Sequence, residues 1–392
     1  MPGTPDRRIV RTIWPMIVAA IISLLPFTIY STFLIPIADD TRTGPALVGT
    51  LRGLGGVAAL AVGVVLAPLV AQWSASRVTA SGLGILAVSS LVGTLDAVWS
   101  IVAFCVGVGA ATAMLTPALL RIATTAYSDP GDAGRAATLV TATQSLAAVL
   151  AAPVIGVIGL WQGWHGALWI TSALAATAGI LFLRKGRADV SVPRPLRYGE
   201  AFRRLRGRRD LLALIGIASL RTTSFMGYLA FLAAQFHERH GLDAVLFTLV
   251  WTLSGASFFT GNFLAGRWAR VSHAHGALLV GGLTAAAAAV LGVFLTDSLA
   301  VALIATVVMG FGHAVVAAQV TTLIAHSGGE LTTPAYSINA AGMSLGVFAG
   351  AFLGGLGLSV AGNVGLAIAL AVPTLVAIAL IRPALIRAQQ HA

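Results

Sequence analysis

Apolar runs long enough to cross a membrane follow one another along almost the whole chain. Of its 392 residues, 57% are hydrophobic and only 9% are charged, and the mean hydropathy is +0.91. A helix needs about 20 apolar residues to cross the hydrocarbon core of a bilayer, so this chain has room for about 12 spans. The sequence therefore predicts an all-α integral membrane protein with no sizeable soluble domain.

A basic stretch divides the predicted spans into two sets of six. The predicted spans are 13–36, 46–70, 78–95, 97–122, 136–159, 166–184, 211–236, 245–265, 276–296, 299–325, 337–361 and 364–384. We expect a six-helix bundle over 1–185, a basic linker over 186–210 and a second six-helix bundle over 211–392. The linker is best interpreted as an orientation anchor, with contact to anionic lipid as the alternative.

The positive charges indicate how the chain lies in the membrane. If the N-terminus is cytoplasmic, nearly all arginines fall on the cytoplasmic side and only Arg42 and Arg239 fall outside. This asymmetry predicts a multi-pass protein of the cell membrane with both termini in the cytoplasm. The formal net charge of +11 then reports topology, and no nucleic-acid partner is expected.

The two sets of spans resemble each other. The segment that begins at Leu69 matches the one that begins at Leu264, an offset of 195 residues. A row of small residues in the fifth span matches a row in the eleventh at an offset of 194, which indicates duplication. Small residues let helices approach closely, so tight packing and a role in movement between states are equally open. The candidate gating residues are Ala152, Pro153, Gly156, Gly342, Gly346, Gly350 and Arg267.

Several classes of function are excluded or unsupported. Lys185 is the only lysine, so the chain has no GxxxxGK[ST] phosphate loop. It also has no HExxH zinc helix and no GxSxG nucleophile elbow. Its single cysteine, Cys105, can form neither an internal disulfide nor a cysteine-based metal site. We expect no enzyme activity, no catalytic residues, no metal and no organic cofactor.

Ionisable residues inside predicted spans are the strongest functional signal, because a buried charge is costly unless it is paired or lines water. Arg52, Arg221 and His313 lie well inside spans two, seven and ten. Asp39 and Asp40 end the first span and could pair with Arg52 as an outer latch. Arg121 is close enough to its span end to reach the interface.

No carboxylate lies at the centre of a predicted span, although the chain has thirteen acidic residues. Asp39, Asp40 and His313 are therefore the candidates for proton coupling. Two arginines without a buried acid would also suit an anionic group on a substrate. The remaining candidate substrate-binding side chains are Tyr30, Gln144, Tyr228, Trp251, Gln319 and Asn339, with Gln235 as a further hydrogen-bonding candidate.

Three motifs resemble the major facilitator superfamily and, within it, its twelve-span drug:proton antiporter and sugar-efflux branch. The run Leu34–Asp40 is similar to the family's LLPxIAxD, and Ala152–Gly156 followed by Gly163-Trp164-His165 is similar to its GPxxGG and GWR. Span eleven resembles the SxxN…xLG pattern from Ser337 onward. The resemblance implies two pseudo-symmetric six-helix bundles and alternating access to a central site lined by spans one, four, seven and ten.

The sequence departs from the family pattern in two places. Ala71 and Gln72 occupy the positions of an Asp-Arg pair that latches the cytoplasmic gate in the family. Ala103 stands four residues before Gly107, where the family has an arginine linked to proton transfer. The first change argues against the ion-pair latch, and the second argues against proton antiport by the family's usual route.

The favoured interpretation is a secondary transporter that exports a small organic molecule or drug in exchange for protons. A facilitator or anion-coupled carrier for a sugar, amino acid or organic acid is the alternative within transport. A non-transporting membrane sensor or scaffold is the alternative outside it. The expected partners are a small-molecule substrate, protons and membrane lipids, and we expect a monomer.

Overall fold

The computed structural model describes residues 6–66, 73–127, 129–185, 198–268 and 275–385. Every regular element in these ranges is helical. The side chains of Gln144, Ala152 and Arg267 lie outside the described part, as do the predicted gate positions Ala71 and Gln72.

The helices of the first 185 residues form one bundle, the N-terminal half. Its elements are α1 (Asp6–Thr32), α2 (Leu34–Asp40), α3 (Pro45–Leu51), α4 (Leu54–Ala61), the π-helical η1 (Val62–Leu66), α6 (Ala75–Val92), α7 (Val98–Thr125) and α8 (Pro130–Lys185). The C-terminal half has α10 (Arg209–His240), α11 (Ala244–Trp268), α12 (His275–Leu295), α13 (Leu299–Gly328), the short η3 (Gly329–Leu331), α14 (Thr332–Ala379) and α15 (Ile381–Leu385). The short helix α9 (Tyr198–Leu205) lies between the halves in the sequence.

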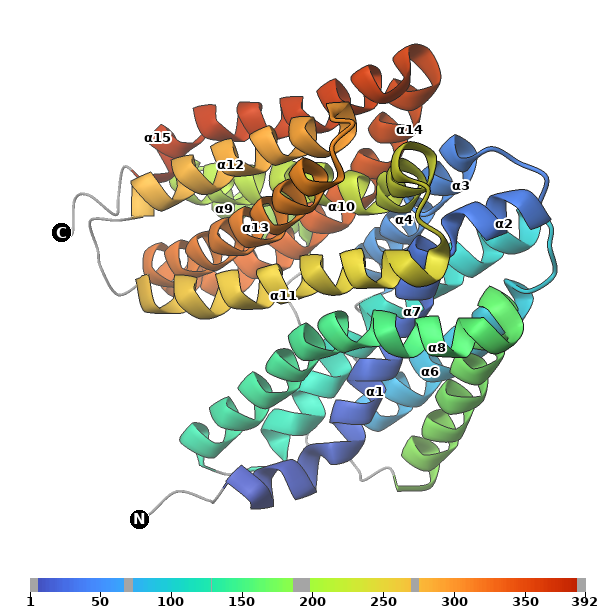
Figure 1. Cartoon of the computed structure of the whole chain (residues 1–392). Helices are drawn as coiled ribbons and strands as arrows, with labels where there is room; N and C mark the ends of the chain where they lie inside the picture. The colour runs from blue at the N-terminus through green and yellow to red at the C-terminus, as the bar shows by residue number, and fades with distance from the viewer. Residues whose placement is uncertain (1–5, 67–72, 128, 186–197, 269–274, 386–392) are drawn as a thin grey trace.

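Two long elements, α8 and α14, each contain two spans. Helical geometry breaks at Gln162 and Gly163 in α8 and at Ala361 and Gly362 in α14, and both elements fold back there (Figure 1). Nine described stretches are long and apolar enough to cross a membrane. Val149–Arg184 overlaps two predicted spans and Leu299–Ala379 overlaps three, so together the nine stretches overlap all twelve predicted spans. The twelve-span all-α prediction is therefore confirmed.

The first two spans are less regular than predicted. Span one bends at Phe33, between α1 and α2, and span two is interrupted at Arg52 and Gly53, between α3 and α4. Glycines at 53, 55 and 56 explain this second break, since glycine is a weak helix former. A π-helical turn then follows α4, and residues 67–70 of the predicted span lie outside the described ranges. The interruption leaves Arg52 between α3 and α4, where the backbone keeps right-handed helical dihedral angles.

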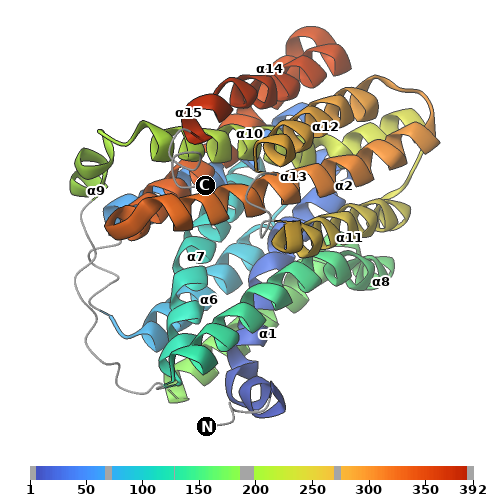
Figure 2. The ribbon, with the colours of Figure 1, turned by 90° about the vertical axis from the view of Figure 1, so that its left-hand side faces the viewer.

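The two halves pack along two seams. The α8 helix contacts α11, and α14 contacts α3 and α4. Both termini lie at the same end of the molecule, on the left in Figure 1 and facing the viewer in Figure 2.

Burial along these seams changes from one end to the other. At the end away from the termini, Ala351 and Gly355 of α14 are buried against Gly53 and Thr50 of the N-terminal half, whereas residues 336–345 nearer the termini are at most partly buried. The span of α3 and α4 shows the same gradient, from buried Val48 to exposed Val65. The halves therefore meet at the end away from the termini.

Exposed aromatic and aliphatic side chains mark the lipid-facing surface. Trp14, Trp73 and Trp268 lie towards the end that carries the termini, and Trp99 and Trp161 lie towards the other. Tryptophan is enriched at both membrane interfaces, so these residues are placed as two aromatic belts. Exposed leucines and valines lie between the belts, as expected for a surface covered by lipid.

The described part of the predicted linker is short and basic. Helix α9 packs against α14, with Leu205 buried and Phe202 exposed. Arg208 donates hydrogen bonds to both carboxylate oxygens of Asp210, at 3.0 and 2.7 Å, and to the carbonyl oxygen of Ser327. The hydrogen bonds that Arg208 donates to the Asp210 carboxylate raise the pKa of Arg208 above its ordinary value. This network fastens the start of α10 to the end of α13.

Candidate substrate and coupling site

A buried arginine–histidine pair lies at the centre of the C-terminal half. Arg221 of α10 and His313 of α13 are each only 5% exposed. Nη1 of Arg221 hydrogen-bonds Nε2 of His313 and lies 3.2 Å from Nδ1. The ring of Phe225 stacks on His313 at a centroid distance of 3.7 Å, and Phe258 of α11 lies 5.8 Å from it. The sequence placed both ionisable residues inside spans, and the structure shows that they contact each other.

Tyr228 belongs to the same aromatic cluster. Its ring stacks on Phe225 at 6.2 Å, and its hydroxyl donates a hydrogen bond of 3.1 Å to Thr306 Oγ1 of α13. Tyr228 thus fastens α10 to α13 two turns from Arg221. The Arg221–His313 and Tyr228–Thr306 links both lie within the C-terminal half.

Arg52 connects the two halves. It ends α3, is 6% exposed, and donates a hydrogen bond of 3.2 Å from Nη1 to the carbonyl oxygen of Met226 in α10. Its guanidinium carbon also lies 5.5 Å from the centre of the Phe27 ring, within range of a cation–π interaction. The outer latch expected between Arg52 and Asp39 or Asp40 is not formed, because Arg52 points to Met226 and Asp40 bonds elsewhere.

Neither interior arginine has an acidic partner among the described residues. The Nε atoms of Arg52 and Arg221 are both buried without a hydrogen-bond partner. The described carboxylates lie near helix ends, which agrees with the pattern in the sequence. Burying a charge without a counter-charge costs on the order of several kcal/mol of free energy, even after the surrounding structure relaxes. The membrane interior of this protein therefore carries uncompensated positive charge.

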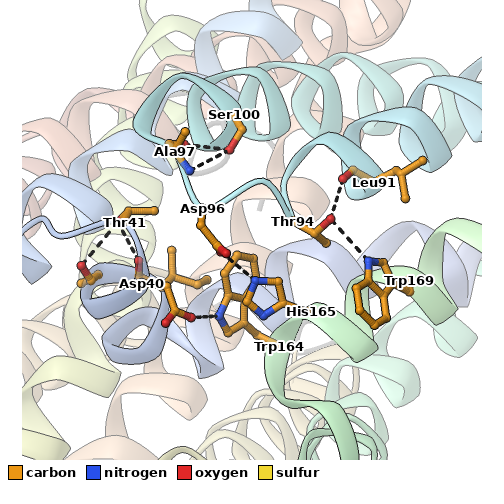
Figure 3. Close-up of polar contacts among 12 residues, drawn as sticks. Asp40, Thr41, Leu91, Thr94, Asp96, Ala97, Ser100, Trp164, His165 and Trp169 are labelled. Atoms are coloured by element: carbon orange, nitrogen blue, oxygen red, sulfur yellow. Dashed lines mark hydrogen bonds and ion pairs between the residues drawn. The ribbon is translucent and has the colours of Figure 1, made fainter.

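Asp40 belongs to a polar cluster at the end away from the termini (Figure 3). Its Oδ2 accepts a hydrogen bond of 2.7 Å from Trp164 Nε1, and His165 Nε2 lies 2.7 Å from Asp96 Oδ1. One ligand atom each from Asp40, Asp96 and His165 lies within 4.8 Å of the others, so these residues are the candidate metal ligands of the described chain. The cluster joins three segments of the N-terminal half. Its two hydrogen bonds hold these segments together at the surface, which explains the cluster without a metal ion.

Asp39 does not belong to this cluster and lies beside residues of the C-terminal half. It lines a cavity of about 200 Å³ between the halves, opposite His237 and Asp243. His237 Nδ1 donates to the carbonyl oxygen of Leu242 at 3.0 Å, and Asp243 caps the start of α11 through Leu246 N–H. Sequence analysis did not identify His237 and Asp243, because both lie in the predicted connection after span seven.

The remaining candidate side chains contact groups in their own half. Tyr30 donates 2.7 Å to the Val48 carbonyl oxygen, and Gln319 Oε1 lies 2.6 Å from His275 Nδ1. The other pairs are Gln235 Nε2 with the Val293 carbonyl oxygen at 3.0 Å, Asn339 Nδ2 with Met343 Sδ at 3.5 Å, and the Trp251 ring against Phe247. Most of these contacts hold neighbouring helices together.

The predicted small-residue gating positions fall into two groups. Gly156, three residues after the partly buried Pro153 of α8, faces Thr248 of α11 across the seam. Gly342, Gly346 and Gly350 instead pack against α10 within the C-terminal half, at residues Ser219, Thr222 and Thr223.

Sequence analysis missed the glycines at the other seam. Gly56 of α4 approaches the backbone of Ser344 and Phe348 in α14, and Gly355 of α14 approaches Thr50. The glycines at 53, 55 and 56 were the sequence feature that could have indicated this close approach of α4 to α14.

Two helical halves that enclose buried polar groups at and beside their interface are an architecture typical of membrane transporters. Residues 16–333 match the family model of the Major Facilitator Superfamily, and the chain belongs to that family.

Among curated proteins, it is 28% identical over 338 residues to a chloramphenicol efflux pump of Mycobacterium tuberculosis, found in strains CDC 1551 / Oshkosh and ATCC 25618 / H37Rv. The match covers 82% of this chain and 79% of the relative.

Solved structures with the same fold include a bacterial homolog of the human lysosomal transporter Spinster. Its inward-facing, unoccupied form superposes with a TM-score of 0.73 at 17% identity, and its inward-facing, occupied form with a TM-score of 0.67 at 17% identity. Each comparison covers 99% of this chain and 96% of the other. At this identity the likeness concerns the fold alone.

Proposed function

We propose that this transporter exports a small organic molecule by alternating access and that protons entering the cell drive the export. The observation that carries the proposal is the buried Arg221–His313 pair, which joins α10 to α13. His313 is a side chain of the type that titrates near neutral pH, and it lies mid-span with no carboxylate beside it among the described residues. It is therefore our candidate proton carrier.

Protonation of His313 changes the chemistry of the pair. A neutral imidazole nitrogen can accept a hydrogen bond from Arg221, whereas a protonated ring has no acceptor nitrogen left. Protonation also places a second positive charge beside the guanidinium. Both effects separate α10 from α13 at this point. Because α10 also receives the Arg52 hydrogen bond at Met226, movement of α10 is transmitted to the N-terminal half.

The arrangement of the halves supports an inward-facing conformation, in which the substrate binds from the cytoplasm. With both termini in the cytoplasm, the seam contacts at Gly156 and Gly355 lie at the outer end and close it. The facing helices are more exposed towards the termini, so the cytoplasmic end is the open one. Domains 1–185 and 211–392 then rock about this contact, and one copy of the chain is sufficient for transport.

Chloramphenicol is the first substrate to test, because a relative over most of the chain is a chloramphenicol efflux pump. A second candidate function is a carrier for an organic anion. The two interior arginines that lack an acidic partner favour it, since guanidinium groups bind carboxylates well.

The test uses protein reconstituted in liposomes, with chloramphenicol counted inside under an imposed pH gradient. We expect gradient-driven chloramphenicol movement for the unaltered protein and its loss in His313→Ala. His326→Ala is the matched control, because His326 is an exposed histidine of the same helix α13, and it should retain transport. Transport that is independent of the gradient, or equal in His313→Ala, would contradict proton coupling through His313. Absence of movement in every condition would reject chloramphenicol as a substrate.

A further inference from the structure

The positive charge of Arg221 is the less compensated of the two interior charges. Arg52 has the Met226 carbonyl oxygen at 3.2 Å and the face of the Phe27 ring, both of which present partial negative charge. Arg221 has only a histidine ring and, at 3.5 Å, the carbonyl oxygen of His313. A neutral histidine supplies no net negative charge. Arg221 therefore remains the cation of the described interior that most lacks an anion.

A second donor without a partner lies beside Arg221. The hydroxyl of Ser224 is buried with no hydrogen-bond partner, and Ser224 as a residue is 1% exposed. Residues three apart on a helix are neighbours on its surface, so Ser224 and Arg221 share a face of α10. In contrast, the hydroxyl of Ser219 on the same helix already donates to the Ile215 carbonyl oxygen at 3.0 Å. Buried donors are rarely left unpaired in stable proteins.

We propose that Arg221 and Ser224 bind one small monovalent anion, which balances the interior charge of the C-terminal half. The guanidinium Nε–H and the serine hydroxyl are the donors, and the anion accepts from both. The His313 ring now occupies the Nη1 side of Arg221, so the anion enters when this ring turns aside. Inorganic chloride and the carboxylate of an organic molecule offer the same chemistry.

This inference deepens the transport proposal by naming a co-ligand of the same region, but binding requires neither transport nor proton coupling. The two proposals also respond differently to His313. Removing its ring stops proton-driven transport in the first proposal, whereas it leaves both donors in place and frees space for the anion in the second. His313→Ala therefore separates failure of one proposal from failure of the other.

The experiment measures the melting temperature of the purified full-length protein in detergent. A bulky sulfonate without a carboxylate group, the sodium salt of HEPES, is replaced stepwise by sodium chloride at constant ionic strength, and sodium acetate is used in a second series. A ligand that binds the native state raises the melting temperature in a saturable way. We expect saturation with at least one of the two salts. Saturation with chloride identifies an inorganic-anion site, and saturation with acetate alone identifies a carboxylate site.

Variants of α10 assign the effect to this site. Arg221→Gln should abolish the saturable rise, and Ser224→Ala should raise the apparent dissociation constant about tenfold, as expected for one hydrogen bond to a charged ligand. Ser219→Ala is the matched control and should leave the constant unchanged, and His313→Ala should keep or strengthen binding. If Arg221→Gln does not fold, Ser224→Ala decides the matter. A rise that is absent in the unaltered protein, or equal in Ser224→Ala and Ser219→Ala, overturns the proposal.

Discussion

The N-terminal and C-terminal halves make their last reversal with nearly the same backbone. Gly163 in α8 has φ 58° and ψ −153°, and Gly362 in α14 has φ 58° and ψ −147°. The preceding residues, Gln162 and Ala361, also match, with φ −139° and −140°. The duplication inferred from short sequence matches thus extends to individual dihedral angles.

The polar interior, in contrast, is not duplicated. At the sequence offset of 195, Arg221 corresponds to Pro26, and His313 corresponds to Ala118. Arg52 of the N-terminal half corresponds to Phe247 of the C-terminal half. The comparison teaches that the repeat determines how helices are arranged, whereas residues that differ between the two halves determine where charge lies. Breaking a repeated feature should therefore affect both halves alike, and breaking an unrepeated one should not.

The largest effect is expected at the seam between the halves. A Cβ at Gly56 would lie 2.4 Å from the Ser344 carbonyl oxygen and 2.7 Å from the Phe348 backbone nitrogen, so Gly56→Ala requires α4 and α14 to move apart. We expect transport to fall at least about tenfold, because a displacement of about 1 Å in a packed interface is not absorbed locally. Gly84→Ala is the control within the same half, since its Cβ would meet nothing within 4 Å. Equal transport in both variants would show that the seam tolerates separation.

The second prediction tests the repeated reversal directly. Gly163→Ala and Gly362→Ala should each destabilise the protein by about 1–3 kcal/mol, because their backbone conformation is accessible almost only to glycine. A Cβ at either position would meet nothing within 4 Å, so strain and not crowding is the cause. Denaturation of the purified protein in detergent measures the change. Gly281→Ala, in open space on the helix α12, should be neutral or stabilising. A large difference in destabilisation between Gly163→Ala and Gly362→Ala would show that the two reversals are not equivalent.

The smallest effect is expected at the unrepeated link between halves. Arg52→Met removes the hydrogen bond to Met226 but also removes a buried charge, so the two contributions partly cancel and about 1 kcal/mol remains. The frequency with which the end away from the termini opens should therefore rise by less than about tenfold. Maleimide labelling of Thr50→Cys in a Cys105→Ala background reports this opening. Labelling that stays unchanged would show that Arg52 does not hold the halves together.

Much of the fold could be predicted because lipid leaves few alternatives. Apolar runs of sufficient length must become spanning helices, and this identified twelve spans and the break between the two sets. Arg221 and His313 could likewise be recognised as interior groups from their position in the sequence. Their mutual contact could not, since it depends on how α10 and α13 rotate against each other.

The side-chain contacts that were wrongly predicted or missed also depend on how the helices pack. The pairing of Arg52 with Asp39 or Asp40 was plausible from the sequence, but Arg52 donates its hydrogen bond to Met226 of the other half. Asp40 instead met Trp164, which lies 124 residues away. Close approach at Gly56 and Gly355 was likewise invisible, because it requires both halves in place.

The sequence by itself determined the spans, the duplication and the kind of residue that lies within the membrane, because hydropathy, spacing and charge are properties of the chain alone. Only the tertiary structure decided which of those residues touch: Arg221 with His313, Arg52 with Met226, and neither arginine with an acid in the described chain. The physical reason is that side-chain pairing depends on helix rotation and distance, which are fixed only when all helices pack together.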